Sequence, residues 1–512
     1  MLETRPGGEV RVFAQYKGDV SEQADVVVVG SGPCGAVVAR ELAHSGASVL
    51  LLEEGPPFTP QDFELNGSLS MARTMREGGL RFTTGGQHLP TMQAIALGGG
   101  SLVNSAICVR PPSWVFDGWC GDFELEHTSR TDLDPHFDAV EKFLGIAPTP
   151  ENVQGARNLL LKRACDALGY SSEPIARNVT GCRGSGECYT GCRNRAKQSM
   201  DLTYIPDAIR AGARVLTSVQ VQRVLAEGSR VTGVVGQVVQ PFTGRRSYRV
   251  HVRAKVVVLA AGVMATPVIL QKSGDLANRS GQVGENLQFH PGVAVAAFFP
   301  EPTDPQFGAT QGYHTLQFLK EGFKIETLWA PPPLLAARLP GYGRALKRRI
   351  AELSHCAVWD AIVSCHRSTG RVRARCFGMQ PRLTYRIHPE DTVLLRRALW
   401  VLTELFFAAG ARTILPPVFG APEELHSLAD AEVLRRAWRA RDFAMASTHA
   451  FCSTRMHSDP RRGVVDEFGR CHDLENLYIV DTGIFPRSPS VNPMLTGMAL
   501  AHRSAGFIAE RL

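Results

Sequence analysis

Residues 25–35 read DVVVVGSGPCG, and this stretch decides the fold of the chain. The run from Asp25 to Val29 is β-branched and apolar after its first residue, as expected of a buried parallel strand. The spacing G-x-G-x-x-G follows at once, and Pro33 suits the first turn of a helix. We therefore expect a strand, a tight turn and a helix that runs from about Pro33 to His44.

Each glycine of the turn has a physical role in holding a dinucleotide. Gly30 permits the tight turn, Gly32 lets the backbone approach a pyrophosphate, and Gly35 lets the helix pack closely on the strand. The helix N-terminus, with Pro33 and Cys34 in its first turn, presents unpaired N–H groups to phosphates. These residues are therefore the expected phosphate contacts.

A second strand and an acid complete the unit. Residues 48–52, SVLLL, predict a strand that ends at Glu53, where a carboxylate can accept hydrogen bonds from a ribose diol. A lone G-x-G-x-x-G is weak evidence, and a glycine-rich turn without a ligand is the alternative. Strand, turn, helix, strand and terminal acid in this order favour a dinucleotide site.

A second glycine-rich segment, residues 96–104, reads ALGGGSLVN. Consecutive glycines such as Gly98 and Gly99 are poor in regular elements, but they suit a backbone that passes close to a flat ring. Ser101 belongs to the same loop, and Asn104 could bond the ring edge or a phosphate. A plain surface turn is the alternative.

Later segments return to the same sheet. Strands are expected at residues 213–217, 219–225 and 255–259, and a helix is expected from Ala265 to about Gln271. Within these, the backbone of Val221 could pair with an adenine edge. The cofactor domain is therefore assembled from separated pieces, with a second domain inserted between them.

In this order, with residues 283–291 (VGENLQFHP) and the block 449–496, the motifs resemble the glucose–methanol–choline (GMC) oxidoreductase family. The nearest pattern is that of long-chain alcohol oxidases, with cholesterol oxidases as cousins. The resemblance implies an α/β fold, α+β overall. Its Rossmann-like FAD-binding domain is discontinuous, and its substrate domain lies on a largely antiparallel sheet. The expected bounds are 1–110, 200–296 and 441–512 for the FAD-binding domain, 111–199 for a connecting region, and 297–440 for the substrate domain.

The resemblance also implies a catalytic pair. His449 occupies the family's active-site histidine position and would be the base that takes the hydroxyl proton. Asn492 matches the second member, which is His or Asn across the family, and would orient the substrate oxygen. The alternative is that His449 is a core histidine and that Asn492 caps the following helix.

Further contacts to the flavin follow from the same resemblance. Asp481 and Thr482 fit the family's contacts to the ribityl-phosphate region. A helix is expected after Pro493, from about Met494 to Glu510, with its positive end at the flavin pyrimidine edge. No histidine immediately precedes Gly98, so a covalent flavin link is not expected there.

One segment departs from the family pattern. The family's Gly-Thr-Cys-Arg-Met-Gly appears here as CSTRMH at residues 452–457. The loss of both glycines predicts either a different backbone path or added bulk near the ring, and we assign no role to Cys452 or His457.

A cysteine cluster has the spacing C-x5-C-x3-C, at Cys182, Cys188 and Cys192. Thiolates bind iron, and some membrane-linked dehydrogenases of the family resemble this arrangement and carry an iron–sulfur cluster. Three ligands fall short of a closed tetrahedral site. We favour a loop over the flavin with free or paired thiols, and no metal.

Composition narrows the remaining choices. The 512 residues are 44% hydrophobic and 21% charged with net charge +7, and the scattered positive charges give no nucleic-acid footprint. The 12 cysteines in a chain of this size favour a reducing compartment, hence the cytoplasm.

Residues 1–21 lack the apolar core of a signal peptide, and no apolar run would span a bilayer. The basic amphipathic stretch 340–353 is compatible with peripheral membrane contact, although a helix with a solvated face is preferred.

Three functions are weighed. The first is FAD-dependent oxidation of a hydrophobic alcohol to an aldehyde or ketone, with O2 or a protein as electron acceptor. The apolar residues 328–335 and 402–409 suit such a substrate. The second is a non-redox flavoprotein lyase of the same fold. The third is a dehydrogenase subunit that passes electrons through an iron–sulfur cluster.

Overall fold

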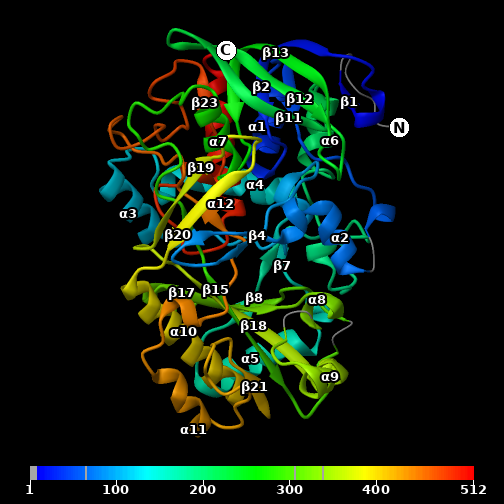
Figure 1. Ribbon diagram of the computed structural model, residues 1–512, viewed down its shortest axis with the longest axis vertical. Coiled ribbons are helices and arrows are strands. Elements are labelled where there is room, and N and C mark those ends of the chain that lie inside the picture. Colours follow the sequence, from blue (N-terminus) through cyan, green and yellow to red (C-terminus); the bar gives the residue numbers. More distant parts are fainter. Residues whose placement is uncertain (1–7, 64–65, 305–306, 337–338) are drawn as a thin grey trace.

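The computed structural model describes residues 8–63, 66–304, 307–336 and 339–512. It divides into two parts along its longest axis (Figure 1). One part holds an eight-stranded sheet and both ends of the described chain, and the other holds an antiparallel sheet. The predicted fold class is confirmed, because the first sheet draws its strands from three widely separated regions of the sequence.

The eight-stranded sheet is mainly parallel in its centre. Neighbours follow the order β1-β10-β3-β2-β13-β12-β11, and β23 pairs with the end of β13. All the pairs from β1 through to β13 are parallel, as is β23 on β13, whereas β12 pairs antiparallel with both β13 and β11. The bounds are β1 Glu9–Arg11, β2 Val20–Val29, β3 Val49–Leu52, β10 Arg214–Leu216, β11 Val219–Glu227, β12 Arg230–Val239, β13 Arg246–Leu259 and β23 Leu477–Ile479.

Helices cover this sheet, and two of them deliver residues to the site. α1 (Pro33–His44) has the predicted bounds and packs against α12 (Met494–Ala509) and α6 (Tyr204–Arg210), while α4 (Arg130–Leu144) packs on α12. The two main helices come close because Gly497 has no side chain. A Cβ at that position would lie 2.9 Å from Sγ of Cys34.

The second sheet is antiparallel throughout, in the order β21-β15-β18-β17-β16-β8. Its strands are β8 Glu173–Pro174, β15 Gly292–Phe298, β16 Tyr313–Thr315, β17 Phe323–Leu328, β18 Cys356–Val363 and β21 Thr413–Leu415. Helices α5 (Ala156–Leu168) and α10 (Pro389–Ala408) pack on it, and the rings of Trp359 and Phe406 stack at 3.9 Å. The sheet therefore takes strands from residues 173–174 and 292–298 as well as from 297–440.

The two apolar stretches that suggested substrate walls belong to the core instead. Leu402, Leu405 and Phe406 are fully buried in α10, and Trp329 and Leu335 are buried in a cluster with Phe298. Neither stretch is therefore evidence for the kind of substrate.

Short elements connect the two parts. A three-stranded sheet, in the order β19-β20-β5, lies between them (Figure 1). The remaining bounds are β4 Arg81–Phe82, β5 Thr84–Gly85, β6 Pro90–Thr91, β7 Ala147–Pro148, β9 Ala176–Arg177, β14 Gln288–Phe289, β19 Thr369–Ala374, β20 Pro381–Arg386, β22 Ala450–Phe451, α2 Gly67–Thr74, α3 Ser113–Phe123, α7 Ala265–Lys272, α8 Pro332–Ala336, α9 Gly343–Ala351 and α11 Leu428–Ala431.

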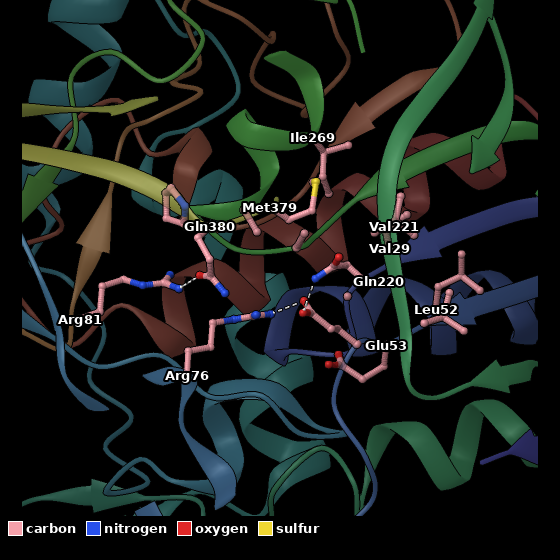
Figure 2. A pocket seen from close by; sticks show the side chains of 16 residues that line it. Val29, Leu52, Glu53, Arg76, Arg81, Gln220, Val221, Ile269, Met379 and Gln380 are labelled. Atoms are coloured by element: carbon pink, nitrogen blue, oxygen red, sulfur yellow. Dashed lines mark hydrogen bonds and ion pairs between the residues drawn. The ribbon is translucent and has the colours of Figure 1, made fainter. Parts of the chain in front are cut away.

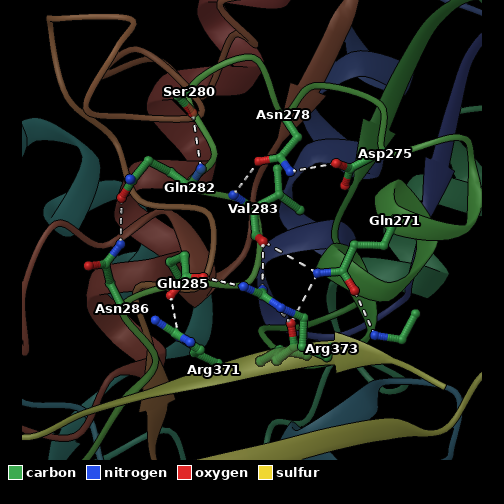
Figure 3. A network of polar contacts seen from close by, with 12 residues as sticks. Gln271, Asp275, Asn278, Ser280, Gln282, Val283, Glu285, Asn286, Arg371 and Arg373 are labelled. Atoms are coloured by element: carbon green, nitrogen blue, oxygen red, sulfur yellow. Dashed lines mark hydrogen bonds and ion pairs between the residues drawn. The ribbon is translucent and has the colours of Figure 1, made fainter.

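A polar network fixes the segment that leads from α7 to β14 (Figure 3). The amide nitrogen of Gln271 donates to the carbonyls of Val283 and Val372, at 3.3 and 3.0 Å. Arg371 and Arg373 of β19 both bond the carboxylate of Glu285. The ion pairs lie at the surface and contribute little, so the Gln271 amide and the backbone hydrogen bonds of Gly284 and Leu287 tie the segment to β19.

No helix in the described part of the chain combines the length and the apolar character needed to cross a membrane. The segment 1–21, in which no signal peptide is expected, lies outside the described residues over its first seven positions.

Candidate active site

The first glycine turn has the geometry expected of a phosphate-binding site. Gly30 has a φ of 102°, in the left-handed region that favours glycine, and Gly35 lies against it. Gly32 is the N-cap of α1 and offers no side-chain cap, so the first turn, which begins with Pro33 and Cys34, keeps N–H groups available to an anion. A Cβ on Gly32 would meet no protein atom within 4 Å, so the space at this position is open.

Glu53 lies at the end of β3, beside this turn. Its Oε2 accepts hydrogen bonds from the backbone N–H and hydroxyl of Ser31, at 2.9 and 2.6 Å, and Oε1 accepts from Gly55 N–H at 2.7 Å. Burial raises its pKa, and these hydrogen bonds oppose the rise. In this structure Glu53 therefore braces the turn, in addition to lining the neighbouring pocket.

That pocket extends from the turn across the open end of the sheet (Figure 2). Val221 of β11 lines it together with Gly30 and Glu53, as the sequence suggested. Pocket residues that the sequence did not single out include Glu54, Arg76 and Gln220. Glu54 lies just after β3, Arg76 lies just after α2, and Gln220 belongs to β11.

Glu54 is the charged centre of this pocket. It forms an ion pair with Arg76 at 2.6 Å, and its Oε1 accepts from Nε2 of Gln220 at 2.7 Å. Burial works against ionisation of Glu54, but these partners outweigh it and lower its pKa. In the sequence this residue is simply the second of two adjacent acids, and nothing there indicates that an arginine 22 residues later closes on it.

The second glycine segment touches the first. Gly98 and Gly99 have φ values of 94° and 54°, and a Cβ on Gly99 would lie 2.6 Å from Cα of Gly32. The hydroxyl of Ser31 accepts from Gly98 N–H at 2.9 Å while it donates to Glu53. Ser101 closes the loop through its hydroxyl, which donates to the Gly98 carbonyl at 2.6 Å.

Asn104 ends this segment and faces α12. Its amide nitrogen lies 3.0 Å from Sδ of Met494, and its Oδ1 accepts from Ala106 N–H at 3.0 Å. Its backbone carbonyl accepts from Nζ of Lys197 at 2.9 Å. Asn104 therefore lies at the N-terminus of α12, where the expected flavin edge would be.

The C-terminal strand brings Asp481 and Thr482 to the same edge. Asp481 is buried, and its carboxylate accepts from Gly262 N–H, the Thr266 hydroxyl and Gly483 N–H at 3.0, 2.6 and 2.7 Å. The Thr482 hydroxyl donates to the Ala450 carbonyl at 2.8 Å. Both residues thus hold the C-terminal strand to the segments around Gly262 and Ala450.

The N-terminus of α12 is free of a side-chain cap. The N-cap is Pro493, which makes no capping hydrogen bond, and Asn492 lies before it. Oδ1 of Asn492 instead accepts a hydrogen bond from Nζ of Lys324 at 2.6 Å. The capping role considered for Asn492 is therefore wrong, because its oxygen is bound to a lysine of the second sheet.

His449 lies in a row of polar side chains. Its Nδ1 is 3.3 Å from Nδ1 of His290, and the other ring nitrogen of His290 contacts Oγ of Ser488. Among the described residues, no group hydrogen-bonds Nε2 of His449, and the residue is only partly buried. Burial lowers the pKa of His449 to about 4, and it lowers that of His290 well below its ordinary value. Both imidazoles are neutral at neutral pH.

A buried ion pair connects His449 and Asn492. Lys324 and Glu326 lie two residues apart on β17, and their side chains are 0% and 3% exposed. Nζ of Lys324 lies 2.6 Å from Oε2 of Glu326. Glu326 counteracts the fall in the pKa of His449, and Lys324 adds to it. Asp360 is the cross-strand neighbour of Glu326, and burial together with Glu326 raises its pKa well above the ordinary value, which favours the protonated acid.

The segment 452–457, which departs from the family pattern, begins at a residue with a left-handed backbone conformation. Cys452 has a φ of 73°, a conformation that glycine adopts freely and a cysteine rarely adopts. Its buried Sγ lies 3.6 Å from Oε1 of Gln288. His457 is fully buried, packs on the ring of Phe123, and accepts from Asp459 N–H at 3.0 Å. Cys452 thus carries a side chain at a left-handed backbone position, and His457 is held by contacts within the protein.

The cysteine cluster holds no metal site by its geometry. Cys182, Cys188 and Cys192 are free and half-buried, and the described residues contain no group of His, Cys, Asp or Glu side chains arranged to hold a metal ion.

These features fit FAD. The open space at Gly32, two helices without side-chain caps and a polar pocket between β3 and β11 lie at one edge of the sheet. When FAD binds, Gly32 and the first turn of α1 would hold the pyrophosphate, Glu54 and Val221 would border the adenosine, and Asn104 and Pro493 would border the ring.

Comparison with known proteins gives matches over most of the chain. Two family models described as GMC oxidoreductase match residues 71–292 and 366–501, and a model described as FAD binding domain matches residues 23–80. An uncharacterized GMC-type oxidoreductase of Mycobacterium tuberculosis is 34% identical over 97% of this chain and 77% of its own length. A long-chain-alcohol oxidase of Arabidopsis thaliana is 27% identical over 96% and 68%, and a cholesterol oxidase of Acinetobacter baumannii is 22% identical over 95% and 94%.

Solved structures confirm the fold. A variant of formate oxidase from Aspergillus oryzae superposes with a TM-score of 0.74 over 96% of this chain and 99% of its own, at 17% identity. At that identity the likeness concerns the fold alone.

Substitutions at two glycines of the turn distinguish an effect on FAD binding from an effect on folding. We expect Gly32→Ala to leave the Tm of the cofactor-free protein unchanged but to weaken FAD binding, because the methyl group enters the space a pyrophosphate needs. Gly35→Ala should lower the Tm of the cofactor-free protein, since its Cβ would lie 2.0 Å from the Gly30 carbonyl oxygen. Overpacking of this kind costs about 1–3 kcal/mol. Thermal unfolding measures the Tm, and titration with FAD measures the affinity for the cofactor. An equal loss of Tm in the two variants would contradict the separate roles given to Gly32 and Gly35.

Proposed function

The chain belongs to the GMC oxidoreductase family, and from that premise we propose that it oxidises the CH–OH group of a hydrophobic alcohol to an aldehyde or ketone, with His449 as base and Asn492 as its partner. It is an FAD-dependent oxidoreductase. Bound FAD supplies the acceptor for the hydride that leaves the alcohol carbon. The protein's own residues must then bind the hydroxyl, hold it in place and take its proton.

One observation carries this proposal. The buried pair Lys324 and Glu326 reaches both members of the expected catalytic pair, through the hydrogen bond to Asn492 and through its electrostatic effect on His449. Charges lose their hydration on burial even when they are paired, so a lysine and a glutamate at 0% and 3% exposure need a specific reason. A reaction that separates a proton from an oxygen at this place provides one.

Lys324 fixes the direction of the Asn492 amide. An ammonium group only donates hydrogen bonds, so the atom of Asn492 that faces it must be the carbonyl oxygen. The amide nitrogen then points elsewhere, and no described protein group accepts from it. Asn492 therefore offers an N–H donor to the substrate oxygen, which is the polarity needed as that oxygen gains negative charge.

His449 would receive the proton on Nε2. That nitrogen accepts a proton only if the hydrogen of the neutral ring is on Nδ1, which then donates to Nδ1 of His290. The hydrogen of His290 would in turn lie on the nitrogen that faces Ser488. Once His449 is protonated, the nearby Glu326 carboxylate stabilises the imidazolium, in agreement with its effect on the pKa of His449.

The substrate class rests on the relatives. A long-chain-alcohol oxidase and a cholesterol oxidase align with nearly the whole chain, which favours a lipophilic alcohol and O2 as the electron acceptor. An acceptor protein is the alternative. All twelve cysteines are free, which supports a reducing compartment. Neither the lyase alternative nor the iron–sulfur subunit gains a specific observation in its favour.

The redox activity has a direct test. Under anaerobic conditions, 1-dodecanol or cholesterol should bleach the flavin absorbance of the holoenzyme, and His449→Gln should slow bleaching by about 10²–10⁴-fold because the base is lost. His457→Gln is the matched control, since that histidine is buried away from Lys324 and Glu326. A flavin that no alcohol reduces would contradict the proposal.

The pH dependence follows from the lowered pKa of His449. Below about pH 4 the imidazole is protonated and cannot accept a proton, so kcat/KM should fall as the pH drops through about 4 and stay level above it. An ordinary histidine would give that fall near pH ~6.5. Stopped-flow reduction of the flavin across this range decides between the two, with circular dichroism as the control for folding.

The donor role of Asn492 predicts an asymmetric response to substitution. Asn492→Asp keeps an oxygen for Lys324 but removes the N–H donor, so kcat should fall by about 10²–10³-fold while the protein stays folded. Asn492→His restores a donor and should recover part of the activity. Equal activity of the Asp variant and the wild type in steady-state assays would contradict the role.

A further inference from the structure

A second, small pocket lies in the loop of residues 182–197, away from His449. It is lined in part by Cys182, Cys188 and Cys192, together with Lys197 and Thr310. Each of the three cysteines is half-buried, and all three line this one pocket.

Two buried cations lie beside this pocket without a carboxylate partner. Arg177 and Lys197 are 2% and 1% exposed, and neither forms an ion pair with a carboxylate of the described residues. Nη2 of Arg177 donates to Sγ of Cys188 at 3.0 Å. Nζ of Lys197 donates to three carbonyls, those of Leu102, Asn104 and Cys188, at 2.7, 2.9 and 2.9 Å.

Buried cations require a nearby anion, and the sulfur of Cys188 is the group in place to be one. Burial raises the pKa of Cys188, but Arg177, Lys197 and a hydrogen bond from Thr310 outweigh it, and the net pKa is lowered. Burial raises the pKa of the neighbouring Cys182 instead. Asp201 also acts on Lys197 but makes no ion pair with it.

We propose that Cys188 is a thiolate and the reactive member of a three-cysteine site that takes hydroperoxides and other small soft electrophiles. The geometry that supports this is the guanidinium bond to its sulfur, the two unpaired cations and the shared pocket. An O2-dependent oxidase would produce hydrogen peroxide nearby, but the site itself stands independently of the proposed function.

The reaction balances with peroxide as the oxidant. The thiolate of Cys188 attacks one peroxide oxygen, the O–O bond breaks, and hydroxide leaves and takes up a proton, giving a sulfenic acid and water. The thiol of Cys182 or Cys192 then attacks that sulfur and expels a second water. Two thiols lose two electrons in total, and one peroxide becomes two waters.

Oxidation at Cys188 would reach the cofactor through Lys197. When the thiolate becomes a disulfide, Arg177 and Lys197 lose their anion while they stay buried. Lys197 holds the carbonyls of Leu102 and Asn104, which belong to the second glycine segment. We therefore expect the oxidised protein to release FAD more readily than the reduced protein.

The test compares two thiols of one chain. The holoenzyme is first reduced, and the reductant is then removed. It is alkylated with iodoacetamide at pH ~6.5, which is below the pKa of a free thiol. Peptide mass spectrometry follows the rate at each cysteine. Cys376 is exposed and serves as the accessible reference. Cys188 should react about five- to tenfold faster than Cys376, because its larger thiolate fraction outweighs its lower nucleophilicity.

Two variants test the partners of the sulfur. Thr310→Val removes one hydrogen bond to the sulfur and should narrow the difference in rate, while Arg177→Met should abolish that difference.

Peroxide treatment gives the second readout. One equivalent of hydrogen peroxide should block alkylation of Cys188, join it to Cys182 or Cys192, and raise the Kd for FAD, and dithiothreitol should reverse all three. Cys188→Ser should show no peroxide effect. Alkylation of Cys188 no faster than of Cys376 would overturn the proposal. So would iron and acid-labile sulfide in the purified protein, because the three sulfurs would then be cluster ligands.

Discussion

The contact between two glycine segments is the constraint on which the cofactor site depends. Gly30 and Gly35 bring β2 and α1 together, and Gly99 brings the second segment within van der Waals contact of Gly32. Any side chain at these points would push the backbones apart and displace the N–H groups that should face the phosphates. Ser31 joins the same contact, because its hydroxyl bonds both Glu53 and Gly98.

The region around His449 and Asn492 depends on a buried ion pair rather than on close contact between backbones. Lys324 and Glu326 come from the antiparallel sheet, whereas His449 and Asn492 come from segments that return to the cofactor domain. The ion pair therefore lies where the two parts of the molecule meet. Its lysine acts on Asn492, and its glutamate acts on His449. Lys324 donates a hydrogen bond to the oxygen of Asn492, and Glu326 counteracts the fall in the pKa of His449.

The sequence predicts the local elements well and the long-range contacts poorly. The helix from Pro33 to His44 has the bounds that its glycines and proline indicate, and the strand at 255–259 is present, but it begins at Arg246 because its polar first half pairs with β12. Motif order predicts that His449 and Asn492 act together, and the structure places both beside the Lys324–Glu326 pair. Lys324 and Glu326 could not be found, because FKIETL reads as an ordinary alternating strand and its partner Asn492 lies 168 residues away.

The pairing of β13 with β23 has a consequence for how the protein is made. Leu477 to Ile479 add to a sheet whose other strands end at residue 259, and the helix that follows supplies the second face of the ring site. During synthesis, which proceeds at about 5–20 residues per second, the earlier strands must wait for this last segment. The end of β13, from Val257 to Leu259, therefore lacks its second neighbour until residues 477–479 have been made. A complete site can therefore take up the flavin only after β23 has paired with β13 and α12 has packed beside α1.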